Sequence, residues 1–72
     1  LNAAYAAIER GDKVSAEKYL KKAGNGAEAD NARGCLAVMN EDYETAKTFF
    51  EKASAAGLKG AQENLEKILP NL

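Results

Sequence analysis

The stretch that decides the fold covers residues 27–60, AEADNARGCLAVMNEDYETAKTFFEKASAAGLKG. On both sides of the acidic pair Glu41-Asp42, apolar residues recur at intervals of three and four, which is the period of an amphipathic helix. The pattern predicts a helix over residues 27–40 and a second one that is capped by Asp42 and ends near residue 56, before Gly57. We therefore expect a helical hairpin with a tight acidic turn.

The flanking segments show the same helical period. Helices are predicted over residues 1–10, 13–23 and 60–69, separated by Gly11-Asp12 and by the loop Gly24-Asn25-Gly26, and Pro70 marks the limit of the last one. No segment alternates apolar and polar residues as a half-buried strand does. The sequence predicts an all-α fold of about five helices.

Internal repetition organises these helices. Moving the chain by thirty residues places Gly11-Asp12 on Glu41-Asp42, Ala16 on Ala46, Leu20 on Phe50 and Ala23 on Ala53. Helical hairpins that repeat with a period of 30 to 34 residues predict a stacked solenoid, in which each unit packs mainly on its neighbours.

Length and charge narrow the range of functions. The chain has 72 residues, enough for one domain, and its ten basic and eleven acidic residues are well mixed, with a net charge of −1. This balance predicts no nucleic-acid partner, and the absence of a run of about 18 apolar residues predicts no membrane insertion. Because the chain begins with Leu1 inside a predicted helix, we expect it to be part of a larger protein.

The sequence offers few groups for catalysis. It has no histidine, and its single cysteine, Cys35, has no second cysteine with which to form a metal site or a disulfide. We interpret Cys35 as a small packing residue, with a reactive thiol as the alternative. Glu41, Asp42 and Glu44 suit helix capping better than a calcium loop. We expect no enzymatic activity, no catalytic residue, no cofactor and no metal.

Residues 27–60 resemble a tetratricopeptide repeat and have the length of that family's unit. The resemblance rests on Ala27-Glu28-Ala29, Gly34, Asp42-Tyr43, Ala46, Phe50 and Ala53, and the closing segment is also similar to the Sel1-like variety. It implies antiparallel hairpins stacked as a short right-handed solenoid. The implied divisions of this single domain are a partial first hairpin (1–26), a complete repeat (27–60) and a C-terminal capping helix (61–72).

Some positions depart from the family pattern. Asp30 and Arg33 stand where the family has large apolar residues, Ala37 replaces a tyrosine, Glu41 a turn glycine and Leu58 a proline. We therefore expect the helix over 27–40 to pack thinly or to expose a face. The earlier copy is four residues shorter between hairpins, so its second helix, over 13–23, is predicted to be about one turn shorter.

The resemblance also implies a binding groove on the concave side, which the first helix of each hairpin lines. Its residues would be Leu1, Tyr5 and Ile8 in the first copy, and Glu28, Asn31, Cys35 and Val38 in the complete unit. Only Asn31 matches the row with which some members clamp a terminal carboxylate, so we expect an extended or helical peptide with apolar anchors instead. Alternatively, Tyr5 and Ile8 simply cover the core.

Two functions follow from the resemblance. The first is a protein–protein interaction module, a scaffold that binds a protein or peptide partner through this groove. The second is a structural spacer in a longer repeat protein, without a ligand of its own. The N-terminal stacking face around Leu1, Tyr5 and Ile8 also offers a route to weak self-association. The Asn-Ala-Arg-Gly and Gln-Glu-Asn-Leu segments are similar to repeats of bacterial cell-envelope proteins, which suggests a periplasmic location and leaves a cytoplasmic one open.

Overall fold

The computed structural model describes residues 2–72, with side chains from Ala3 onward, and Leu1 lies outside the described residues. This part of the chain forms five α-helices and no β-strand. The helices are α1 (Asn2–Glu9), α2 (Lys13–Ala23), α3 (Ala27–Met39), α4 (Tyr43–Ala55) and α5 (Lys59–Ile68), followed by the 3-10 turn η1 (Leu69–Asn71). The predicted all-α class is confirmed, and the predicted boundaries in this part differ from the observed ones by one residue at most.

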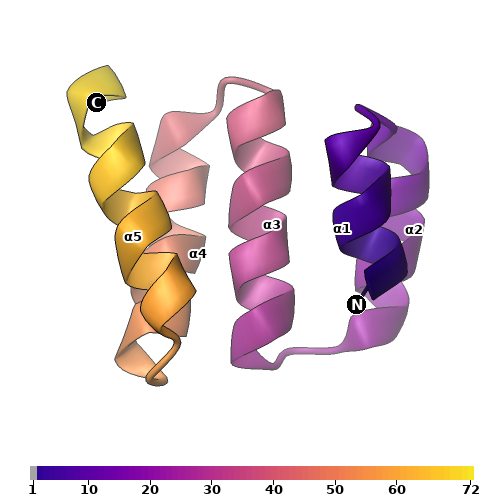
Figure 1. Ribbon diagram of the computed structural model, residues 1–72, viewed down its shortest axis with the longest axis horizontal. Helices are drawn as coiled ribbons and strands as arrows, with labels where there is room; N and C mark the ends of the chain where they lie inside the picture. Colours follow the sequence, from indigo (N-terminus) through magenta and orange to yellow (C-terminus); the bar gives the residue numbers. More distant parts are fainter. Residues whose placement is uncertain (1) are drawn as a thin grey trace.

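Helix α3 lies at the centre of the molecule and packs against each of the other four helices. Consecutive helices run in opposite directions, so α1, α3 and α5 point the same way and lie side by side, with α2 and α4 behind them (Figure 1). Connections of three residues join all the helices, and such short connections favour antiparallel neighbours. The arrangement has two layers, and one of them consists of α1, α3 and α5.

The turns within the two hairpins are built alike. Asp12 accepts a hydrogen bond from the backbone N–H of Ser15 (3.2 Å), and Asp42 accepts the equivalent bond from Thr45 (3.3 Å). The residue before each aspartate has a left-handed backbone, with φ of 76° at Gly11 and 58° at Glu41. Both predicted N-caps are confirmed, and Glu41 adopts a conformation that glycine accepts at lower energy.

The predicted shortening of the second helix by a whole turn is wrong. Helix α2 has 11 residues and α4 has 13, so the difference is two residues, or about half a turn. The prediction assumed a 34-residue second unit, but α3 and α5 begin at Ala27 and Lys59, 32 residues apart. Because the connections have equal lengths, this two-residue difference is the whole difference between the segments from Gly11 to α3 and from Glu41 to α5.

The core consists of two clusters that meet on α3. The first contains small side chains and two leucines and is shared by α1, α2 and α3; its buried members are Ala4, Ala7, Ala16, Leu20, Ala32 and Leu36. The second is shared by α3, α4 and α5 and consists of Ala37, Ala46, Phe50 and Ile68. Alanine gives little apolar area, so helices must approach closely to bury it.

Helices α3 and α4 approach each other closely at Gly34. A Cβ atom added there would lie 2.9 Å from Cζ of Phe50 and closer still to two other ring atoms. Phe50 is only 1% exposed and is the largest fully buried side chain in the described part. Tyr19, in contrast, is 38% exposed on α2, although the helical period places it beside Leu20, so it adds little to the core.

Candidate functional site

The described residues predicted to line a groove lie on α1 and α3, in the layer that α5 completes. The structure divides them into two groups. Tyr5, Glu28 and Asn31 belong to a series of hydrogen bonds, whereas Ile8, Cys35 and Val38 line a hollow. The two groups differ in what they offer a partner.

The hydrogen bonds connect α1, α3 and α5. The Tyr5 hydroxyl donates to the backbone oxygen of Glu28 (3.1 Å) and accepts from Asn31 Nδ2 (3.0 Å). Asn64 Nδ2 then donates to Asn31 Oδ1 (2.9 Å). Asn31 is 8% exposed and both atoms of its amide are occupied, so it acts as a bridge between helices. A buried amide without such partners would destabilise the fold.

The tyrosine in this series remains a neutral hydroxyl. Burial raises the pKa of Tyr5 above its usual value, and the hydrogen bond from Asn31 opposes only part of that effect. A protonated hydroxyl is needed because Tyr5 donates to a carbonyl oxygen. Tyr5 also packs against the first core cluster, as does Ile8. Both residues therefore contribute to the junction of α1 with α3, and self-association through them stays a prediction, with Leu1 outside the described residues.

The second group belongs to a surface depression that we call the α1/α3/α5 hollow. It has a volume of about 280 Å³ and is lined by Ile8, Cys35, Val38, Met39, Phe50, Asn64, Lys67 and Ile68. The side chains of Ile8, Cys35, Val38 and Met39 are half-buried. They retain apolar surface that a partner could cover, and such surface is the main source of binding free energy.

Sequence reasoning missed the contribution of α5 to this hollow. None of the residues predicted to line a groove lies on α5, so Asn64 and Lys67 are additions from the structure. Asn64, Lys67 and Ile68 have the spacing i, i+3 and i+4, which places them on one face of α5. The spacing could have indicated a shared face, but only the packing of α5 on α3 shows that this face meets Cys35 and Val38.

Cys35 has the properties of a packing residue. It is half-buried, and burial raises the pKa of its thiol above the usual value, while the charge of Lys67 opposes only part of this effect. A thiol with a raised pKa forms less of the reactive thiolate at a given pH. In residues 2–72 no group of three or more His, Cys, Asp or Glu side chains is placed to hold a metal ion.

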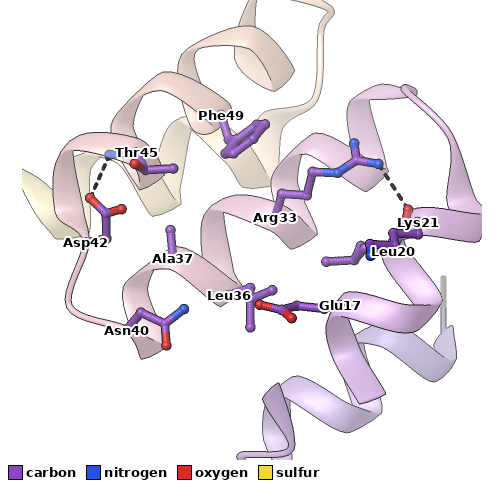
Figure 2. Close-up of a pocket in the computed structure, with 10 residues that line it drawn as sticks. All are labelled: Glu17, Leu20, Lys21, Arg33, Leu36, Ala37, Asn40, Asp42, Thr45 and Phe49. Atoms are coloured by element: carbon purple, nitrogen blue, oxygen red, sulfur yellow. Dashed lines mark hydrogen bonds between the residues drawn. The ribbon is translucent and has the colours of Figure 1, made fainter. Parts of the chain in front are cut away.

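A larger depression, the α2/α3/α4 groove, lies on the opposite face of α3. Its volume is about 470 Å³, and Figure 2 shows its lining residues: Glu17, Leu20, Lys21, Arg33, Leu36, Ala37, Asn40, Asp42, Thr45 and Phe49. The apolar floor is already covered, since Leu20, Leu36 and Ala37 are 3%, 8% and 7% exposed. Despite its size, this groove offers a partner less uncovered apolar surface than the hollow.

The guanidinium of Arg33, which lines this groove, forms hydrogen bonds within the molecule. It donates to the backbone oxygens of Leu20 (3.0 Å) and Gly24, and its guanidinium lies 3.1 Å from Asp30 Oδ1 (Figure 2 shows the bond to Leu20). These carbonyl groups belong to the C-terminal end of α2, where a positive charge is favourable. Asp30 and Arg33 therefore do not leave α3 thinly packed against α2, because both are half-buried and Arg33 binds the end of α2. The alternative expectation, that α3 exposes a face, stays a prediction.

Comparisons with known proteins do not change this picture. No family model, curated protein or solved structure matches the chain. None of the helices in residues 2–72 combines the length and the apolar character needed to cross a membrane. The candidate site is therefore defined by the geometry of α1, α3 and α5.

Proposed function

We propose that the chain is a protein-interaction module that binds a peptide segment of a partner in the α1/α3/α5 hollow. The proposal includes the finer architecture that the sequence suggests, a tetratricopeptide-like stack of hairpins with α1, α3 and α5 on its concave side. Two features support the stack: the turns before α2 and α4 are built alike, and α3 packs both on α4 of its own hairpin and on α2 of the preceding one.

The observation that carries the proposal is the state of the side chains in the hollow. Ile8, Val38 and Met39 come from two helices, surround one depression and remain half-buried. Covering such apolar surface contributes about 25 cal/mol per Å², and the entropy lost on association offsets part of this gain. The rigid helices around the hollow reduce the entropy that binding loses.

A structural spacer is the second candidate, and one observation favours it. The bonds among Tyr5, Asn31 and Asn64 connect three helices of the same layer. A segment whose only task is to hold neighbouring parts of a protein at a fixed distance needs such bridges and no free surface. In that case the hollow has no ligand.

A display selection separates the two candidates. The chain is used to select from a library of short random peptides, and the enriched peptides are measured against Val38→Glu and Val14→Glu. The two variants carry the same substitution, but Val14 is 79% exposed on α2 and does not line the hollow. We expect Val38→Glu to weaken binding by at least about tenfold, because it places a charge on the apolar contact, and Val14→Glu to leave it unchanged.

Circular dichroism of both variants verifies that the helices are intact before binding is compared. If no peptide is enriched, or if all enriched peptides bind Val38→Glu as well as the unaltered chain, the hollow is not a peptide site and the spacer is the better account.

A further inference from the structure

The charges around the two depressions are distributed differently. The α2/α3/α4 groove has two acidic and two basic residues, Glu17 and Asp42 against Lys21 and Arg33. In the α1/α3/α5 hollow Lys67 is the one charged residue among those that line it. Cys35 is the other titratable group there, and its raised pKa keeps it neutral. The hollow is therefore an apolar surface with a single positive charge at its side.

Asn64 adds a hydrogen-bond acceptor beside this charge. Its Nδ2 is used inside the molecule, since it donates to Asn31 Oδ1 (2.9 Å) and lies 3.9 Å from Cys35 Sγ. Its Oδ1 accepts no hydrogen bond from the side chains described, which begin at Ala3, or from the described backbone. Asn64 and Lys67 are three residues apart on α5, so the acceptor and the cation are neighbours on one helix face.

We infer that the hollow selects peptide segments in which an apolar side chain is followed or preceded by aspartate or glutamate. The apolar side chain covers Ile8, Val38 and Met39, the carboxylate pairs with the Lys67 ammonium, and a peptide N–H donates to Asn64 Oδ1. This inference rests on the proposed function and specifies the chemical class of the partner. A basic segment is disfavoured, because no carboxylate lines the hollow to receive it.

The expected size of the charge preference is modest. Lys67 is exposed, so water and salt screen its interaction with a ligand. One such pair changes affinity by about two- to fivefold, and the effect declines as ionic strength rises. Apolar contact sets the overall affinity, and Lys67 selects among apolar peptides.

The test repeats the selection from random peptides with Lys67→Glu and with Lys47→Glu. Both variants change the net charge equally, but Lys47 is exposed on α4 and lines neither depression. We expect the unaltered chain and Lys47→Glu to enrich peptides with acidic residues beside apolar ones, and Lys67→Glu to enrich basic residues instead. For one selected acidic peptide, affinity should decrease about two- to fivefold in Lys67→Glu and less at high salt.

The outcomes separate this inference from the function on which it rests. If enriched peptides lose binding in Val38→Glu but show no acidic bias, or if Lys67→Glu leaves the bias intact, the hollow binds peptides without charge selection and the inference is wrong. If no peptide depends on Val38, the proposed function itself fails. If Lys47→Glu removes the bias as fully as Lys67→Glu, net charge explains it and the role of Lys67 is rejected.

Discussion

The two hairpins, α1–α2 and α3–α4, solve the same packing problem with different residues. Thirty positions apart, Ala4 and Leu20 of the first hairpin correspond to Gly34 and Phe50 of the second. Where the inner side chain is leucine, the facing helix carries a methyl group; where it is phenylalanine, the methyl group is absent and the ring fills its place. The combined volume of the two facing side chains, rather than the volume of either one, determines how closely the helices approach.

The ends of the second helices differ in a similar way. After α4, the backbone N–H groups of Gly57 and Leu58 donate to Ser54 (2.9 Å) and Ala53 (3.1 Å). After α2, Arg33 from the next hairpin binds the carbonyl groups instead. The C-terminal end of α4 is thus capped by backbone N–H groups that directly follow it, and the C-terminal end of α2 by a side chain from α3. The end of the first hairpin is therefore held by a side chain of the second.

The largest effect is expected at the helix contact. Gly34→Ala adds a methyl group against the Phe50 ring and should lower the free energy of unfolding by about 1–3 kcal/mol, as measured by urea denaturation. Gly60 lies in α5 with open space around it, so Gly60→Ala should raise the free energy of unfolding by about 0.5–1 kcal/mol.

The comparison becomes sharper in the double variant Gly34→Ala/Phe50→Leu, which reproduces the pair of the first hairpin. It should be less destabilised than the sum of the two single variants, because leucine leaves room for the methyl group. Additive effects on the free energy of unfolding would show that the residues at positions 34 and 50 are not energetically coupled.

The next effect concerns the end of α2. Arg33→Ala removes the donors to Leu20 and Gly24 and leaves Asp30 without its partner, so we expect a loss of about 1–3 kcal/mol of stability. Arg10→Ala is the control, since its ion pair with Asp12 is exposed and long (3.6 Å), and the loss should be below about 1 kcal/mol. Equal losses in the two variants would contradict the special role of Arg33.

A smaller effect is expected at the turns. Glu41→Gly removes the strain of a left-handed backbone at a non-glycine residue. It should stabilise the fold by about 0.5–1 kcal/mol, after the greater entropy of glycine in the unfolded chain is included. Gly11→Ala imposes the same backbone on alanine and should destabilise it by about 1 kcal/mol. Thermal unfolding measures the change in melting temperature of each variant. Changes of the same sign in Glu41→Gly and Gly11→Ala would contradict the equivalence of the two turns.

The smallest perturbation is a chemical one. Because the pKa of Cys35 is raised, the thiolate fraction is low at neutral pH and increases only as pH rises through the raised pKa. A thiol reagent should therefore label Cys35 in the folded chain more slowly than in the urea-unfolded chain, at the same pH. Labelling at equal rates would return the reactive thiol as the better interpretation.

The helices and their aspartate caps could be predicted because each depends on residues close together in the sequence. Helical period and an aspartate before a helix act locally, and the equivalence of Asp12 and Asp42 follows from them. The bridge from Asn31 to Asn64 could not be predicted, since its partners are 33 residues apart and meet only when α5 packs on α3. For the same reason the resemblance predicted Val38 as a groove residue, whereas Lys67 enters the hollow only because α5 packs on α3.

The central claim is that the α1/α3/α5 hollow, and not the larger groove behind it, binds a partner peptide. Methyl NMR of the chain titrated with a selected peptide tests this directly, because Ile8, Val38 and Ile68 report on the hollow and Leu20 and Leu36 on the groove. We predict saturable shifts of the Ile8, Val38 and Ile68 methyl signals with little change at Leu20 and Leu36. Shifts centred on Leu20 and Leu36 would contradict the claim.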